Sequence, residues 1–265
     1  MMLALLATAA LAQDADFQGT AAAPDEGITA KKTTTTLSAE LGGMWTSGNA
    51  QTYTLNAGAN LGSRWQKNKI SAVAGANVGA AVSDLDGNGL LDETERDEGY
   101  TANARRVFGE VRYDRFLTEK DSLYGLVGAF HDIFAGFDLR SHEQVGYSRL
   151  LVNDDTTTLR AELGVDVAQE WRTTDEFAVI PAARLLLGAT HKLNENVSVA
   201  ETFELYENVI DPADLRILNA ASLSTTLSSK FSLKLSHSLI FDNVPVEGFR
   251  KFDQTTAITL VASLL

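Results

Sequence analysis

Apolar and polar side chains alternate with a period of two along most of this chain, from about residue 35 to the C-terminus. A β-strand points successive side chains to opposite sides, so each such segment has one apolar and one polar face. In a soluble sandwich the apolar face forms the core, whereas in an outer-membrane β-barrel it contacts lipid and the charged face lines the lumen. The clearest segment, 158–168, places Leu159, Ala161, Leu163, Val165 and Val167 opposite Arg160, Glu162 and Asp166.

The connections between these segments alternate between short and long, which favours the barrel. Tight polar turns such as Glu119-Lys-Asp121 and Asn153-Asp-Asp155 alternate with longer segments, of which 83–101 is the longest. We therefore predict an all-β fold, a single antiparallel transmembrane β-barrel of about twelve strands within residues 34–265. The expected strands are Thr35–Trp45, Thr52–Trp65, Lys69–Val82, Ala102–Leu117, Ser122–Phe134, His142–Val152, Thr157–Gln169, Phe177–Lys192, Val197–Asn208, Arg216–Leu227, Phe231–Asp242 and Phe252–Leu265.

The N-terminus predicts export. Residues 1–12 are apolar and end in Ala10-Leu11-Ala12, an A-x-A pattern typical of a signal-peptide cleavage site. The chain begins Met-Met where a signal peptide usually carries Lys or Arg, and the alternative is a frayed apolar N-terminus. Residues 13–33 are rich in Ala, Gly, Asp and Thr and have no period, which predicts a disordered periplasmic lead-in.

Composition excludes one class of partner and fits the barrel. The formal net charge is -13, so no basic stripe is available for phosphates and we expect no nucleic-acid partner. The chain has no Cys. A barrel pairs every strand edge and needs no disulfides, so their absence fits a barrel in the bacterial outer membrane, in contact with lipid and lipopolysaccharide.

The alternation of side chains along the strands predicts which residues line the lumen. Arg106, Glu110, Arg112 and Asp114 share one face of their segment. Both signs of charge inside a narrow barrel favour paired ladders over an empty selective channel, because an unpaired charge in a partly dry lumen is costly.

Aromatic residues near the strand ends predict two lipid-interface girdles. They are Trp45, Tyr100, Phe134, Trp171 and Phe241 at one end, and Trp65, Phe116, Tyr124 and Phe231 at the other.

The loop 83–101 contains a complete EF-hand calcium pattern, D-x-D-x-N-G-x5-E. Carboxylate and carbonyl oxygens at this spacing suit Ca²⁺, which takes six to eight oxygen ligands. A strand is expected before the loop, and no flanking helix pair is expected. The alternative is an acidic, solvated loop that only mimics the motif. The predicted ligands are Asp84, Asp86, Asn88, the backbone carbonyl of Leu90, Asp92 and Glu95.

Strand order from a periplasmic N-terminus makes this loop external. We expect weak binding, with a dissociation constant of about 10⁻⁴–10⁻³ M, as in extracellular modules. Calcium would order the loop, offset its acidic self-repulsion and could bridge to lipopolysaccharide phosphates.

The sequence contains no convincing catalytic motif, and we predict that the protein is not an enzyme. The chain has four histidines. His237 lies between Ser236 and Ser238, but neighbouring strand residues face opposite sides, and His131-Asp132 has the same geometry. A barrel lipid hydrolase is therefore the least favoured function.

Two stretches resemble a known family. They are Leu41-Gly-Gly-Met-Trp-Thr-Ser-Gly-Asn49 and the segment 108–140, which includes Tyr113-Asp-Arg-Phe116 and Ala135-Gly-Phe-Asp-Leu-Arg140. They resemble the salt-induced outer-membrane proteins, a bacterial family of β-barrel domains of unknown function, over roughly residues 35–265. The resemblance implies an outer-membrane β-barrel without an established activity. The calcium loop and the terminal Leu265 depart from the family pattern.

These observations predict an envelope protein, structural or a narrow porin-like pore, that responds to ionic conditions and salt stress and carries a calcium-binding external loop. The alternative is a passive channel for ions or small solutes without a calcium role.

Overall fold

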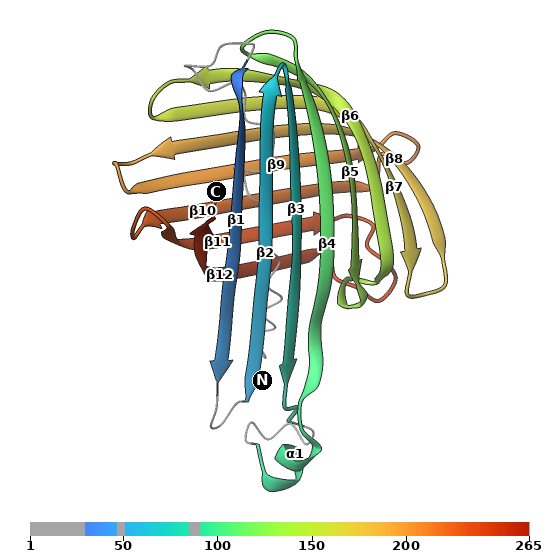
Figure 1. Cartoon of the computed structure of the whole chain (residues 1–265). Coiled ribbons are helices and arrows are strands. Elements are labelled where there is room, and N and C mark those ends of the chain that lie inside the picture. Colours follow the sequence, from blue (N-terminus) through green and yellow to red (C-terminus); the bar gives the residue numbers. More distant parts are fainter. Residues whose placement is uncertain (1–29, 47–50, 85–90, 265) are drawn as a thin grey trace.

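The computed structural model describes residues 30–46, 51–84 and 91–264, which form a closed barrel of twelve antiparallel strands in chain order. Figure 1 shows β1–β4 crossing one wall at a steep angle to β8–β12 on the opposite wall. The strands are β1 Ala30–Thr46, β2 Thr52–Gln66, β3 Asn68–Ala81, β4 Thr101–Phe116, β5 Asp121–Asp132, β6 Phe137–Asn153, β7 Thr157–Arg172, β8 Phe177–Lys192, β9 Val197–Asn208, β10 Leu215–Thr226, β11 Phe231–Asp242 and β12 Phe252–Ser263.

The barrel has a short-turn end and a long-loop end. At the short-turn end, β2 and β3 are separated by Lys67 alone, and Gln66 adopts a left-handed conformation with φ 46°. In the β6–β7 turn, the Asp154 carboxylate accepts hydrogen bonds from the backbone N–H groups of Thr156 and Thr157. The long-loop end carries the connection between β3 and β4. The predicted alternation is confirmed in part: the connections β3–β4, β9–β10 and β11–β12 at this end are long, but β5–β6 and β7–β8 are joined by four residues each, as β4–β5 and β8–β9 are at the other end.

The described helices are short. Helix α1, Glu93–Glu98, lies in the β3–β4 connection, and the 3-10 helix η1, Ile133–Ala135, joins β5 to β6. Neither is long or apolar enough to cross a membrane.

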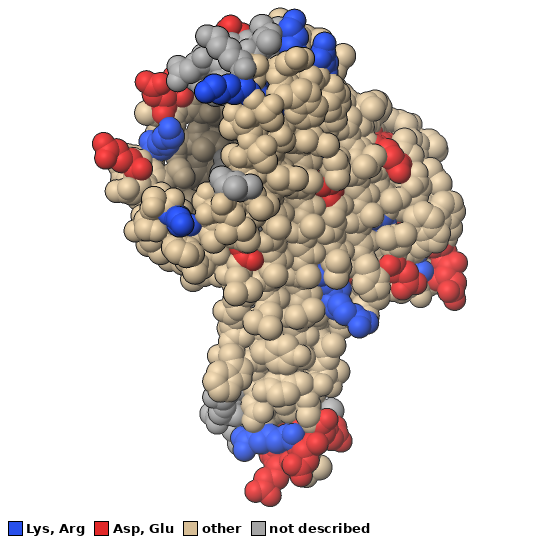
Figure 2. Space-filling model, viewed as in Figure 1, with Lys and Arg blue, Asp and Glu red and all other residues tan. Residues whose placement is uncertain are grey.

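The wall separates side chains as the alternation predicts. On β7, Arg160, Glu162 and Asp166 are buried in the lumen, and Leu163 and Val165 are more than half exposed on the outer face. Figure 2 shows an outer wall of mostly uncharged residues, with charged groups gathered toward the two ends of the molecule. This distribution is the one an outer-membrane barrel requires.

Several details differ from the sequence-based expectation. Strand β1 begins at Ala30, earlier than Thr35, and β6 begins at Phe137 instead of His142, because outward residues near its start are polar and a bulge precedes Leu139. Phe116 and Tyr124 are not girdle residues. Both have inward parity and are only 3% and 4% exposed, because they pack against guanidinium groups in the lumen.

The barrel closes along a short seam. Strand β1 pairs with β12 only over Ser38–Gly42 and Thr259–Ser263, whereas its pairing with β2 extends from Ala30 to Thr46. The far ends of β1–β4 therefore project past the rim at the long-loop end, with α1 at the tip (Figure 1). Trp45, 74% exposed, and the rings of Tyr53 and Tyr100, which contact each other at a tilt of 59°, lie on this projection.

Candidate functional site

The lumen contains a central charge cluster supplied by β4, β7, β8 and β9. Its members share inward parity and are almost fully buried. They are Arg112, Asp114, Arg160, Glu162, Arg184 and Glu204.

Arg112 joins two carboxylates by paired hydrogen bonds. Its guanidinium donates to both oxygens of Asp114, at 3.0 and 2.8 Å, and to both oxygens of Glu162, at 3.0 and 2.8 Å. The same group lies 4.0 Å from the centre of the Tyr124 ring. Planar donors matched to carboxylates in this way give strong, directional contacts. Arg112 is therefore fixed between β4 and β7, with an aromatic ring against its face.

Arg184 extends the cluster toward β9. It donates to Glu162 Oε2 at 2.9 Å and lies 2.8 Å from Glu204 Oε2. Tyr124 accepts a hydrogen bond from the same guanidinium, and Tyr206 donates to Glu204 at 2.6 Å. The result is a chain of alternating charges that crosses the lumen at this level. The predicted paired ladders are confirmed.

A second group of ion pairs, the mouth charge cluster, lies nearer the long-loop end. Glu170 contacts Arg172 and Arg216 at 2.8 Å each and Arg140 at 3.5 Å. Arg216 also lies 3.1 Å from Asp242. The members of this cluster are Arg140, Glu170, Arg172, Asp214, Arg216 and Asp242.

The opposite side of the lumen carries neutral polar side chains around one ion pair, Glu40 of β1 with Lys234 of β11 at 2.7 Å. Asn56, Asn60, Ser71 and Thr259 face inward from β2, β3 and β12. One oxygen of each side chain is buried and has no hydrogen-bond partner within the described part of the chain. We call these four residues the neutral lining. Gly42 of β1 pairs with Thr259 on one side and with Asn56 on the other, so no side chain extends into the lumen between these two residues.

The sequence identified part of this site. Parity predicted Arg112, Asp114, Arg160 and Glu162, and the structure brings all four together. Arg184, Glu204 and the mouth charge cluster were not predicted. A signal existed for Arg184, which is the single charge within the run Ala182-Ala-Arg-Leu-Leu-Leu187.

The predicted calcium ligands are only partly described. Asp86, Asn88 and Leu90 lie outside the described residues. Asp84 is exposed, and Asp92 and Glu95 form a capping box at the start of α1. In it, Asp92 accepts from the Glu95 N–H at 2.9 Å, and Glu95 accepts from the Asp92 N–H at 3.0 Å. Residues 30–46, 51–84 and 91–264 hold no group of three or more potential metal ligands.

The entering segment of the calcium loop is strand β3, as expected, but the exit is a helix, which was not expected. Arg96 replaces the apolar residue of a normal exiting helix, and the Asp92–Glu95 capping box starts α1 in spite of it.

The histidines hydrogen-bond to groups of their own strands or neighbouring strands. His237 faces outward and contacts Thr256 Oγ1 at 2.9 Å, while Ser236 and Ser238 are buried on the lumen side. The expected separation of this His from its neighbouring serines is therefore observed. The pairings of β11 with β10 and β12 cover this whole strand, so its amides are engaged in the ladder and offer no oxyanion site.

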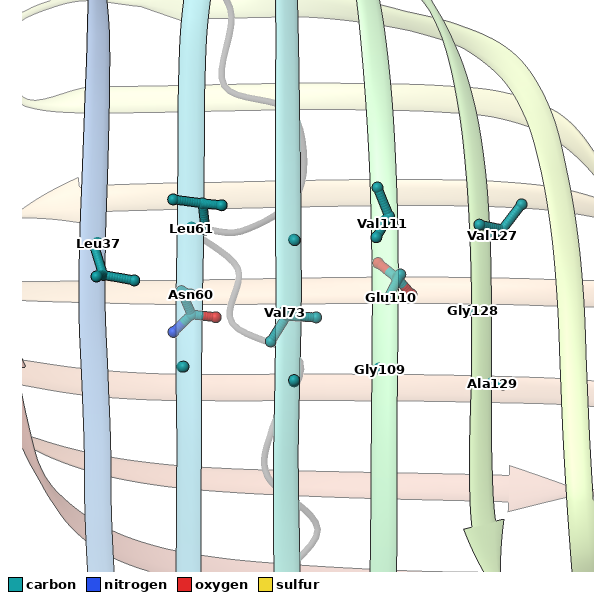
Figure 3. Close-up of a pocket in the computed structure, with 13 residues that line it drawn as sticks. Leu37, Asn60, Leu61, Val73, Gly109, Glu110, Val111, Val127, Gly128 and Ala129 are labelled. Atoms are coloured by element: carbon teal, nitrogen blue, oxygen red, sulfur yellow. The ribbon is translucent and has the colours of Figure 1, made fainter.

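The outer wall carries a shallow groove of about 650 Å³ across β1–β5. Its floor is formed by small residues such as Ala59, Ala74 and Gly109, which are direct neighbours in the strand register. Figure 3 shows larger apolar side chains in a row along it: Leu37, Leu61, Val111 and Val127. This chemistry suits contact with acyl chains.

The closed twelve-strand barrel, with apolar exterior and charged lumen, has the fold of the outer-membrane β-barrel class. The chain belongs to the family described as protein of unknown function DUF481, which matches residues 39–264.

Three solved structures are similar to the chain. The NanC porin is 14% identical, with a TM-score of 0.52 over 86% of this chain and 100% of that one. An outer membrane channel from Pseudomonas putida F1 is 11% identical, with a TM-score of 0.49 over 89% of this chain and 98% of that one. The KdgM porin, solved in complex with disordered oligogalacturonate, is 6% identical, with a TM-score of 0.43 over 88% and 99%. No curated protein matches the chain.

Proposed function

We propose that this protein is a bacterial outer-membrane barrel that forms a narrow pore for small polar solutes. The observation that carries the proposal is the neutral lining. A buried hydrogen-bonding atom without a partner costs about 1–3 kcal/mol, and water or a polar solute removes that cost. The lining atoms gain partners when water enters, so they favour a hydrated passage along this side of the lumen.

The central charge cluster sets the width of that passage. Its ion pairs lie between β4 and β9 and hold large side chains across the lumen. The remaining path runs along the neutral lining, where amide and hydroxyl groups offer hydrogen bonds and the neighbouring charges of Glu40 and Lys234 are paired with each other. We therefore propose that uncharged polar solutes pass in preference to ions.

Because the chain has no Cys, a single introduced cysteine is the only thiol that can react, and its labelling shows whether that position is reached by water. Asn56 and Ala57 are adjacent on β2, with Asn56 buried toward the lumen and Ala57 exposed on the outer face. In refolded barrels in planar bilayers, a water-soluble methanethiosulfonate is expected to label Asn56→Cys and block the current. Ala57→Cys is the matched control and is expected to resist labelling, because lipid covers it. A barrel that inserts without current, and whose Asn56→Cys is never labelled, would refute the pore.

The link to salt stress is part of the same proposal. Ion pairs are screened by salt, and exposed pairs more than buried ones. The mouth charge cluster is partly accessible, since the Arg140 and Arg172 side chains are 19% and 18% exposed. Conductance is therefore expected to rise with ionic strength by more than the rise in bulk conductivity.

We also propose that the loop 83–101 is external and binds calcium. The support is the complete ligand pattern together with the position of α1. Asp92 caps a helix in which Glu95 is the third residue, and Glu95 is only 5% exposed. The two acidic ligands at the end of the loop are thus held close to each other. Calcium would order the acidic loop and could bridge it to lipopolysaccharide phosphates.

Limited proteolysis tests the calcium loop. Calcium at millimolar concentration is expected to slow cleavage within 83–101 several-fold relative to chelator, and Glu95→Gln is expected to abolish this protection. Glu98→Gln, an acid of the same helix outside the ligand pattern, is the control and should keep it. Equal cleavage of the unmodified chain in calcium and in chelator would show that the loop only mimics the motif.

A further inference from the structure

We infer that the outer face of β9–β12 is the interface through which two copies of this chain associate within the membrane. Polar side chains interrupt the apolar wall there. Glu201, Ala221, His237 and Thr256 are consecutive neighbours in the strand register, and Glu201, His237 and Thr256 are exposed. We call Glu201, Asn219, His237, Gln254 and Thr256 the outer polar patch.

Apolar residues flank the patch on both sides along the strands. On β11, Leu233 and Leu235 precede His237 on the outer face, and Leu239 and Phe241 follow it. On β9, Val199 and Phe203 flank Glu201 in the same way. The patch therefore lies inside the apolar band and not at its edge, where lipid headgroups would meet it.

A carboxylate in this position needs a polar partner, because hydrocarbon offers no hydrogen bonds and intramembrane ionisable groups are costly. Asn219 donates one hydrogen bond to Glu201 Oε1 at 3.1 Å, and His237 Nδ1 contacts Thr256. Glu201 Oε2 and His237 Nε2 have no partner in the described ranges and point from an exposed surface.

The patch is complementary to itself. It presents an acceptor on Glu201 and a donor on His237, which is what a two-fold interface requires, because both copies present the same surface. Ala221, between Glu201 and His237, and Ala189, on the other side of Glu201, are small and allow two walls to approach closely. A soluble protein cannot enter the membrane to this depth, and an acyl chain cannot hydrogen-bond to the Glu201 carboxylate. A second copy of the chain lies at the same depth and offers hydrogen-bonding groups.

The inference rests on the proposed placement of the wall in lipid and not on conduction through the lumen. The test uses the Cys-free chain refolded into phospholipid vesicles and oxidised with copper phenanthroline. Ala221→Cys, at the centre of the patch, is expected to form disulfide-linked dimers at least ten-fold faster than Ala57→Cys on the opposite wall. Resistance of Ala57→Cys to a water-soluble thiol reagent checks, in the same sample, that the wall lies in lipid.

Mass measurements in detergent complete the test. The unmodified chain is expected to be a dimer, and Glu201→Leu and His237→Leu are each expected to weaken dimerisation at least ten-fold. Glu143→Leu removes an exposed outward acid of β6, outside the patch, and should leave the dimer intact. Monomeric unmodified chain, or cross-linking of Ala221→Cys no faster than that of Ala57→Cys, would overturn the inference. If the leucine variants do not fold, the cysteine comparison decides alone.

Discussion

Glu162 is the residue on which the central charge cluster depends. Arg112, Arg160 and Arg184 lie 2.8, 3.4 and 2.9 Å from its carboxylate, and its side chain is fully buried. Removing one partner of a buried ion pair leaves an uncompensated charge, which costs about 3–5 kcal/mol. We therefore expect Glu162→Gln to lower the free energy of unfolding by about that amount, measured by urea unfolding of the barrel in lipid vesicles.

Glu143→Gln provides the comparison, because it makes the same change on the exposed outer face, outside the outer polar patch. It is expected to change stability by less than about 0.5 kcal/mol in the same vesicles. A Glu162→Gln barrel as stable as the unmodified one would mean that water already screens the cluster.

The identity of such residues was predictable from parity, but their partners were not. Alternation alone places Arg112 and Glu162 on the lumen side of their strands. Their contact joins residues 50 positions apart, and it depends on the curvature of the closed barrel. The neutral lining was missed for a related reason: Asn, Ser and Thr side chains carry no charge, and alternation does not show which of their oxygens lack partners.

At the scale of elements, the β6–β7 turn is held by one carboxylate. Asp154 accepts from the Thr156 N–H at 2.9 Å, the Thr157 N–H at 2.8 Å and the Thr156 hydroxyl at 3.0 Å. These hydrogen bonds, with that from the Thr156 N–H first, hold the pKa of Asp154 below its ordinary value. The stabilisation is therefore fully present above the unfolded-state pKa, about 3.9, and is lost as the pH falls through the lower folded-state pKa.

Carbon-detected NMR of the labelled barrel is expected to give an Asp154 titration midpoint below about 3.9. In the Asp154→Ala variant, the amides of Thr156 and Thr157 should exchange with solvent several-fold faster at neutral pH. Asp155→Ala, which removes the neighbouring carboxylate, should leave their exchange unchanged. An ordinary midpoint for Asp154 would show that the turn does not depend on this carboxylate.

Element boundaries were predictable where alternation is regular. The bounds of β8, β9 and β11 agree with the expectation at both ends. The start of β6 was missed because the outward residues Ser141 and Glu143 are polar, so no apolar alternation marks the strand there, and because a bulge precedes Leu139. Helix α1 was missed because its six residues, Glu93–Glu98, have no apolar stripe, and the capping box alone marks its start.

At the scale of the whole molecule, the seam between β1 and β12 is the shortest join in the barrel. Two features support it from the lumen side. Lys234 of β11 reaches across β12 to Glu40 of β1, at 2.7 Å, and Gly42 lets β12 approach closely. A Cβ atom at Gly42 would lie 2.8 Å from the Ile258 carbonyl oxygen, so any larger residue forces the two strands apart.

We therefore expect Gly42→Ala to lower the temperature at which the barrel loses its heat-resistant mobility on a denaturing gel. A disulfide should reverse the effect in the variant that also carries Leu41→Cys and Leu260→Cys, because these residues are direct neighbours across the seam. Gly109→Ala is the matched control. A Cβ atom there is 3.8 Å from the nearest atom, an ordinary contact, so the control barrel should melt like the unmodified one. If Gly42→Ala also melts normally, closure does not limit the stability of this barrel, and the central charge cluster becomes the element that does.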